Sequence, residues 1–287
     1  MSDAMRVGIF AKTFVRPTLG ATLDAVAGHG IRTVQFNLAC AGVPSLPERI
    51  EPELAATIRL ELAARNLDMA AVSGTFNMIH PDLEQRRAGL RRLRVLAAAC
   101  RELGTSVITL STGTRDPDDM WRRHPDNGTP EAWRDLSASM LEAVEIADEH
   151  DVTLAFEPEV TNVVDTAAKG RRLLDEVGSP RLKVVMDGAN LFHAGDLPRM
   201  REVLEEAFAL LGRDVVLAHA KDLSRDGDAG HEAAGTGQLD YDLYLSLLRR
   251  AGYRGPLILH GLTEAQVGSS VAFLRQKGAA LGTDEAR

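Results

Sequence analysis

Short apolar runs alternate with stretches of helical periodicity eight times along this chain of 287 residues, and this alternation limits the folds that it can adopt. The apolar runs cover 6–10, 33–36, 68–72, 106–110, 152–156, 183–186, 215–218 and 256–259. The helical patterns that follow them cover 19–27, 51–65, 83–103, 133–150, 165–176, 197–211, 240–250 and 263–281. Strands that alternate with helices form a parallel sheet. Eight units without a break in strand order predict an α/β fold, a closed (β/α)8 TIM barrel.

No shift in composition divides the chain, and 45% of its residues are hydrophobic, which is enough for one large core. We therefore predict a single barrel domain over residues 1–287. The longest loop, 111–130, follows the fourth apolar run, and loops of this length are usually functional or disordered. Because it contains Trp121 and His124, we interpret it as either a lid or a solvated loop. Residues 282–287 are predicted to be a frayed tail.

Charge and cysteine content argue against several classes of protein. The chain has 33 Lys and Arg residues against 41 Asp and Glu, a net charge of −8, which argues against a protein that grips nucleic-acid backbones. No run is long and apolar enough to span a bilayer, and the first residues lack the pattern of a signal peptide. Cys40 and Cys100 offer no disulfide framework. We expect a cytoplasmic enzyme of small molecules, with no nucleic-acid or membrane partner.

Ionisable residues stand directly after the last four apolar runs: Glu157, Asp187, His219 and His260, in that order. In a parallel barrel the C-terminal strand ends share one mouth, where active sites are built. Side chains alternate along a strand. This predicts three inward-facing pairs, which are Ala155 with Glu157, Val185 with Asp187, and Leu217 with His219. Carboxylate oxygens and imidazole nitrogens that converge at the mouth are suited to a divalent metal.

Two other interpretations of these residues stay open. Acids at strand ends often cap the helix that follows, which would explain Glu157 and Asp187 without a metal. The less favoured interpretation of His219 is a core histidine whose hydrogen bonds are satisfied. The convergence of three or four such strand ends favours a metal site over a set of unrelated caps.

Five motifs in the second half of the chain resemble those of the sugar phosphate isomerase/epimerase superfamily, the xylose-isomerase-like TIM barrels. They are FEPE at 156–159, VVMDGAN at 184–190, HAKD at 219–222, GTGQLDY at 235–241 and GYRGPLIL at 252–259. The resemblance implies a divalent metal held by Glu, Asp, His and a second Glu at the ends of strands five to eight. Glu157, Asp187 and His219 take the first three places. His260 stands where the second Glu is expected, and we predict it as the fourth ligand.

The same resemblance implies a carbohydrate substrate and a metal-stabilised enediolate. We expect a keto-sugar, sugar phosphate or polyol, with Mn²⁺ as the favoured metal and Co²⁺, Zn²⁺ or Mg²⁺ as alternatives. Glu157 would be ligand and base together, and His260 or Lys221 would handle the second proton. Because His260 replaces a glutamate, a metal-dependent lyase or dehydratase is the alternative reaction. An endonuclease-type phosphodiesterase and a barrel without catalysis are weaker alternatives.

Polar residues in the loops after several strands are candidates for substrate contact. We predict this role for residues with hydrogen-bonding or charged side chains near the same mouth: Lys12, Asn77, His80, Glu159, Asn162, Asn190 and Arg225. For most of them a loop-stabilising role is an equal alternative. A homodimer or homotetramer is also expected, partly from the resemblance and partly because the apolar loop 36–47 reads as exposed.

Overall fold

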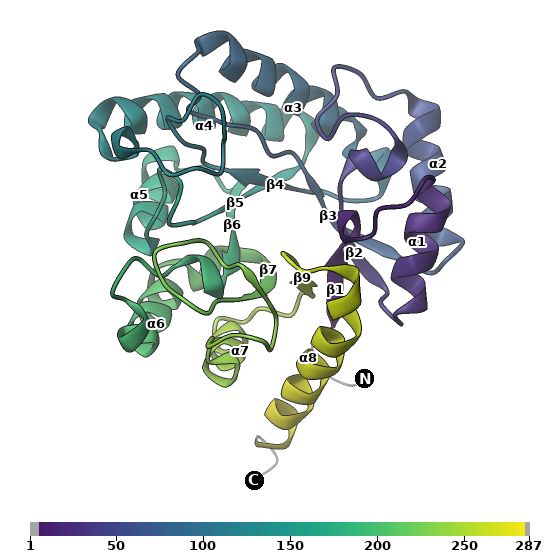
Figure 1. The fold of residues 1–287 in the computed structure, drawn as a ribbon. Coiled ribbons are helices and arrows are strands. Elements are labelled where there is room, and N and C mark those ends of the chain that lie inside the picture. Colours follow the sequence, from purple (N-terminus) through teal and green to yellow (C-terminus); the bar gives the residue numbers. More distant parts are fainter. Residues whose placement is uncertain (1–5, 285–287) are drawn as a thin grey trace.

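The computed structural model describes residues 6–284. Its centre is a closed barrel of eight parallel strands, which confirms the predicted fold (Figure 1). The barrel strands are β1 (Val7–Phe10), β2 (Thr33–Phe36), β3 (Asp68–Ser73), β4 (Val107–Ser111), β5 (Thr153–Glu157), β6 (Leu182–Asp187), β7 (Val215–Asp222) and β9 (Leu257–Leu259). Strands β1 to β7 pair in sequence order, and β9 closes the ring because it pairs with both β7 and β1.

One α-helix follows each barrel strand, and together the helices form the outer layer in this part of the chain (Figure 1). They are α1 (Leu19–Gly28), α2 (Pro52–Ala63), α3 (Leu83–Leu103), α4 (Pro130–His150), α5 (Ala167–Val177), α6 (Met200–Leu211), α7 (Tyr241–Arg250) and α8 (Glu264–Asp284). Short 3-10 helices cover Ala11–Thr13, Leu38–Ala41, Pro125–Gly128, Gly188–Asn190, Leu197–Arg199 and Gly212–Asp214.

Helix α3 shows why the sequence pattern defines these elements well. Its residues Leu93, Leu96 and Cys100 are buried at helical spacing, so one face packs into the core between helices and barrel. The side chain of Asp82 accepts a hydrogen bond from the backbone N–H of Glu84 and caps the N-terminus. Gly104 ends the helix with φ 88°, a left-handed conformation that glycine adopts without strain.

Small and branched side chains fill the inside of the barrel. They form one buried cluster of Phe10, Ala71, Ala155, Val185, Leu217 and Ile258. Ala155, Val185 and Leu217 in this cluster are the first residues of the three pairs predicted to face inward. Each lies two positions before an ionisable residue on β5, β6 or β7, so side-chain alternation points that ionisable residue at the C-terminal mouth.

Three regions differ from the sequence-based expectation. A two-residue strand, β8 (Glu232–Ala233), pairs antiparallel with the end of β7, which therefore runs on to Asp222. Helix α8 continues to Asp284, so 282–284 are helical; residues 285–287 of the predicted tail lie outside the described residues. In the loop 36–47, Phe36 and Leu38 are buried while Ala39 and Pro44 are exposed, so the expected exposed apolar loop is present only in part and the oligomer stays a prediction.

The loop 111–130 is folded against the barrel. It includes the 3-10 helix Pro125–Gly128, and the side-chain oxygen of Asn127 accepts hydrogen bonds from Arg115 N and Thr114 Oγ1 at 2.7 and 3.1 Å. Because these bonds lie within the loop and Trp121, Arg122 and Arg123 are exposed, the lid and solvated-loop interpretations both stay predictions. Across residues 6–284, no helix combines the length and the apolarity that crossing a bilayer requires.

Candidate active site and metal centre

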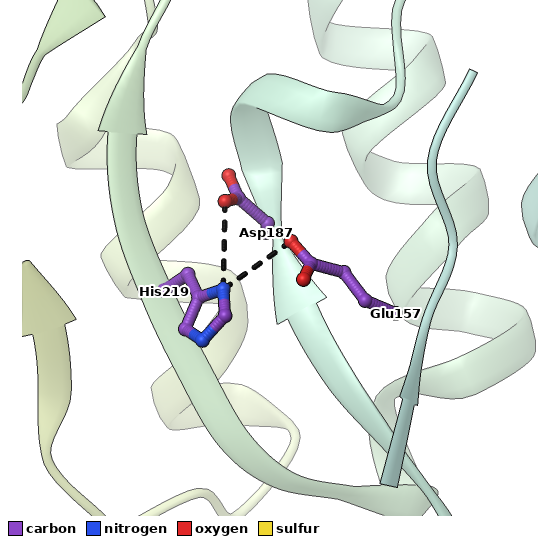
Figure 2. A group of neighbouring side chains, drawn as sticks. All are labelled: Glu157, Asp187 and His219. Carbon is purple, nitrogen blue, oxygen red and sulfur yellow. Dashed lines mark hydrogen bonds and ion pairs between the residues drawn. The ribbon is translucent and has the colours of Figure 1, made fainter. Parts of the chain in front are cut away.

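Glu157, Asp187 and His219 converge at the C-terminal ends of β5, β6 and β7 (Figure 2). Each offers one ligand atom, and the three atoms lie within 4.8 Å of one another. His219 Nδ1 is 3.2 Å from Glu157 Oε1 and 3.8 Å from Asp187 Oδ2. The register of the sheet creates this cluster, because Asp187 and His219 are directly paired across β6 and β7. Two oxygens and one nitrogen at this spacing are a set that a divalent cation accepts.

The hydrogen bond of His219 Nε2 determines whether Nδ1 is available to bind a metal. Its Nε2 lies 2.7 Å from Gln35 Oε1 on β2, while Gln35 Nε2 donates to Thr109 Oγ1 on β4 at 3.2 Å. With the amide oxygen facing the ring, Nε2 carries the proton and donates it. When the ring is neutral, Nδ1 therefore keeps its lone pair for the space between the two carboxylates, which is the tautomer that a metal ligand requires.

Asp187 performs both of the roles that the sequence left open. Its Oδ1 accepts a hydrogen bond from Ala189 N at 3.0 Å and so caps the 3-10 helix that follows β6. Its Oδ2 is buried and accepts no hydrogen bond from residues 6–284. A buried carboxylate oxygen is costly unless a cation faces it, and in the metal-free protein that cation is the ammonium of Lys221, whose Nζ lies 3.2 Å from Oδ2. This oxygen, together with Nδ1 of His219, indicates that the donor set fits a metal.

Lys221 supplies the positive charge next to the two acids. Its Nζ lies 3.2 Å from Asp187 Oδ2 and 3.8 Å from Glu157 Oε1, and its side chain is buried as the sequence predicted for the inward face. Burial lowers the pKa of Lys221, but the carboxylates of Asp187 and Glu157 outweigh burial and raise it. The group is therefore a fixed ammonium in the metal-free protein.

The pKa values of Glu157 and Asp187 shift in opposite directions. Burial raises the pKa of Glu157, but a protonated His219 and the ammonium of Lys221 outweigh burial and hold that pKa well below its usual value in the metal-free protein. For Asp187 burial dominates and raises the pKa, although Lys221 opposes the rise. Glu157 is also oriented by Asn190, whose Nδ2 donates to its Oε1 at 2.6 Å. Glu157 is thus an ionised and oriented carboxylate.

His260 lies beside the cluster of Glu157, Asp187 and His219. Its ring stacks on the ring of His219, with centroids 5.0 Å apart at 18°, and also lies 5.1 Å from the ring of Phe10. Its Nδ1 is buried and has no hydrogen-bond partner among the described residues. Burial, then the charges of Lys221 and His219, hold the pKa of His260 well below its usual value. The fourth-ligand role of this neutral imidazole stays a prediction.

A cavity of about 880 Å³ opens over these residues at the barrel mouth. Glu157, His219, Lys221 and His260 line its deep part. Among the predicted substrate-binding residues, Lys12 and Glu159 also line it. Glu159 is buried, and its Oε1 accepts hydrogen bonds from the side chains of Thr161 and Asn162. Burial first, and the nearby Glu157 charge, raise the pKa of Glu159 although Lys221 opposes the rise.

Four of the predicted substrate contacts have structural partners instead. Asn77 Nδ2 donates to Thr114 O at 2.8 Å, and His80 Nε2 lies 3.1 Å from Pro117 O, so both side chains hold the loops after β3 and β4 together. Asn162 Oδ1 accepts hydrogen bonds from Ser111 Oγ and Gly113 N at 2.6 and 2.7 Å. The exposed Arg225 pairs with Asp228 at 2.9 Å. Their side chains do not line the cavity.

Asn190 acts on the site through Glu157 and through the loop after β7. Besides its bond to Glu157, its Oδ1 accepts a hydrogen bond from Gly230 N at 2.7 Å. Asn190 is fully buried, so it orients the carboxylate and does not reach the cavity itself.

Sequence reasoning missed two residues of the site, Gln35 and His231. Gln35 is buried at 3% exposure on β2, and a polar residue in an otherwise apolar run is the signal that could have found it. His231 lines the cavity and lies 3.0 Å from Ser224 Oγ through its Nε2. It stands just before β8, a strand too short to leave a periodic pattern.

The fold and the site together define a class. The chain forms a closed parallel barrel, with two acids and a histidine at the ends of three adjacent strands, in the place where such barrels carry their active sites. A sequence model of the xylose isomerase-like TIM barrel family matches residues 23–277, and the chain belongs to that family. No curated protein sequence matches the chain.

Several solved structures share this fold at low sequence identity. A D-tagatose 3-epimerase-like protein has a TM-score of 0.78 at 15% identity, over 99% of this chain and 100% of that one. The 3-keto-D-glucoside 4-epimerase from E. coli has a TM-score of 0.70 at 18% identity, over 95% and 99%. The IOLI protein with a bound zinc atom has a TM-score of 0.72 at 15% identity, over 96% and 98%.

Proposed function

We propose that this protein is a divalent-metal-dependent isomerase or epimerase that acts on a keto-sugar through an enediolate. The observation that carries the proposal is the cluster of Glu157, Asp187 and His219 below a cavity large enough for a sugar. The D-tagatose 3-epimerase-like protein and the 3-keto-D-glucoside 4-epimerase, which share this fold, support this substrate class. The zinc atom in the IOLI protein supports a metal in a barrel of this shape.

Glu157, Asp187 and His219 would hold the metal, with His260 as a further candidate. When bound, a divalent cation at such a site supplies stabilisation of the negative charge that an enediolate develops. Mixed oxygen and nitrogen donors favour Mn²⁺, with Co²⁺ and Zn²⁺ also suited. Lys221 then lies next to the same carboxylates and is placed to pair with a substrate oxygen.

Glu157 is the proposed base. Its low pKa keeps it ionised, and Asn190 fixes one of its oxygens at 2.6 Å, so the other is free to take a proton from the carbon next to the substrate carbonyl. The second proton transfer is assigned to Lys221 or His260, which both line the cavity. The lowered pKa of His260 keeps its ring neutral, so it offers a lone pair that can accept a hydrogen bond from a substrate hydroxyl.

A metal-dependent lyase is the second candidate, and one observation favours it. A second carboxylate opposite Glu157 would serve a proton transfer on each face of the enediolate, and the end of β9 presents His260 in its place. An elimination needs one base and a leaving hydroxyl, and it does not need two matched acids.

Solvent exchange separates the two reactions. The metal-loaded protein is incubated in D₂O with a panel of ketoses, and the sugars are read by NMR and mass spectrometry. An isomerase or epimerase incorporates one deuterium next to the carbonyl and forms an isomer without loss of water. Dehydrated product would support the lyase, and the absence of both in every ketose, with metal bound, would overturn the proposal. Glu157→Gln is the matched control for background exchange.

A further inference from the structure

The cavity extends well beyond the residues of the proposed chemistry. Its volume of about 880 Å³ lies near the upper end of the roughly 300–1,000 Å³ that is typical of clefts for drug-sized ligands, which are larger than one sugar ring. The chemical end is the more buried one, because His219 and Lys221, which line it, are only 2% and 5% exposed. A monosaccharide held there would leave the outer part of the cavity unfilled.

Trp121 stands in that outer part. It lines the cavity from the loop 111–130, and it is 52% exposed. Its backbone is nevertheless held firmly: Trp121 N donates to Asp119 Oδ1 at 3.0 Å, and Asp116 Oδ1 accepts from Asp118 N and Asp119 N. Arg122 reaches the second oxygen of Asp116 at 3.1 Å. A bare indole on a fixed turn is a preorganised platform for a ligand ring.

The other tryptophan of the chain, Trp133, has the burial and the contacts expected of a tryptophan with a structural role. Trp133 is 8% exposed, its Nε1 donates to Glu176 Oε2 at 2.7 Å, and Arg172 covers its ring at 4.1 Å. Among residues 6–284 nothing covers the Trp121 ring in this way, so packing within this part of the chain does not explain its position.

The charges that line the cavity favour a neutral ligand. Phosphate groups are usually held by arginine forks or by several cations together. Among the cavity-lining residues of the described chain none is an arginine, and Lys221 lies against the carboxylates of Asp187 and Glu157, which repel a phosphate. Lys12 is thus a lone exposed cation at the mouth. Hydroxyl and amide groups dominate the remaining polar lining, which suits sugar hydroxyls, as shown by Ser45, Ser73, Thr75, Thr263 and Gln266.

We propose that the substrate is an unphosphorylated keto-sugar that carries a second ring, with its carbonyl at Glu157 and its second ring stacked on Trp121. This inference rests on the proposed function for the position of the reacting ring. The second ring has to be attached away from the carbonyl carbon, because a glycosidic bond at that carbon would block the enediolate. Trp121 is accordingly a binding residue that selects for the extended substrate.

Binding to a single-tryptophan variant tests the inference directly. Trp133→Phe leaves Trp121 as the only tryptophan of the chain, so its fluorescence reports the outer part of the cavity. The Mn²⁺-loaded variant is titrated with D-fructose, with fructose 6-phosphate, and with isomaltulose and lactulose, two disaccharides whose fructose carbonyl is free. We expect at least one disaccharide to quench Trp121 and to bind about tenfold more tightly than fructose.

The same ligands are then measured by calorimetry on Trp121→Ala and on Leu141→Ala, which removes a similarly exposed apolar side chain outside the cavity. Trp121→Ala should abolish the preference for the disaccharide and leave fructose binding nearly unchanged, while Leu141→Ala should keep both. Equal or tighter binding of fructose or its phosphate in the wild type, or a preference that survives Trp121→Ala, would overturn the inference.

Deuterium exchange into fructose, measured on the same preparation, tests the isomerase proposal separately from the second-ring site at Trp121. Exchange without a disaccharide preference contradicts the second-ring site and leaves the isomerase intact. A Trp121-dependent disaccharide preference without exchange into any sugar of the set contradicts the isomerase and supports the second-ring site.

Discussion

Gln35 Oε1 and His219 Nε2 lie 2.7 Å apart, and they join β2 to β7, two barrel strands that do not pair with each other. This hydrogen bond decides which imidazole nitrogen is left for a metal. Gln35 is itself held by Thr109 on β4, so three strands cooperate in placing one lone pair between Glu157 and Asp187. Partners of this kind tune the affinity of metal sites.

We expect Gln35→Leu to weaken Mn²⁺ binding by about 10–100-fold, because His219 Nε2 loses its acceptor and the ring loses its tautomer. Gln35→Glu keeps an acceptor at the same place and should retain most of the affinity. Calorimetry on chelator-stripped protein gives the affinities, and ¹⁵N NMR of the imidazole reports the tautomer directly. A Gln35→Leu protein with wild-type affinity and an unchanged tautomer would show that Gln35 does not position His219.

Glu157→Gln should leave the fold intact and lower turnover of the substrate by about 10²–10⁴-fold, because an amide cannot take up the proton. The amide oxygen can still accept the 2.6 Å hydrogen bond from Asn190, so the local structure is preserved. Circular dichroism and thermal unfolding serve as controls for folding. Turnover close to that of the wild type would end the assignment of Glu157 as the base.

The stability of the metal-free protein should fall as the pH drops below about 6.5, the usual pKa of an unfolded histidine. Burial and the charges of Lys221 and His219 depress the pKa of His260 in the folded state. Between the two pKa values the unfolded chain binds a proton that the folded chain does not, so acid favours unfolding. The slope from one such group approaches about 1.4 kcal/mol per pH unit.

Urea unfolding with chelator present, at several pH values between 7.5 and 5, measures this slope. His260→Phe keeps an aromatic ring against Phe10 and His219 but cannot be protonated, so its slope should be flatter by the contribution of one group. The same slope in the wild type and the variant would mean that His260 is not held neutral by the fold.

Much of the fold was predictable because its signals are local. The β2 strand Thr33–Phe36 and helix α3 coincide with the expected ranges, since an apolar run and a helical spacing with an Asp cap and a terminal glycine are both legible in the sequence. The two-residue strand β8 was not predictable, since two residues cannot show a period. Alternation along the strands also predicted the inward positions of Ala155, Val185 and Leu217 correctly.

The candidate site was predictable only where strand geometry controls it. Glu157, Asp187, His219 and Lys221 meet because neighbouring strand ends must meet. The loop residues behaved differently: Asn77 and Asn162 were expected to contact the substrate, yet their amides satisfy backbone and side-chain groups of the loops after β3 and β4. Which loop groups need such partners depends on the folded conformation, and sequence spacing carries no information about it.

The central claim is that Glu157, Asp187 and His219 hold one divalent metal, and titration of Mn²⁺ into chelator-stripped protein by calorimetry tests it most directly. Asp187→Asn keeps the cap on Ala189 but replaces Oδ2 with an amide nitrogen, so it should weaken binding by more than the roughly 100-fold expected for an outer partner. Asp222→Asn, at another buried carboxylate, should bind nearly as the wild type does. One site per chain, lost in Asp187→Asn and kept in Asp222→Asn, is the predicted result; no binding to the wild type, or equal binding to Asp187→Asn, would contradict the account.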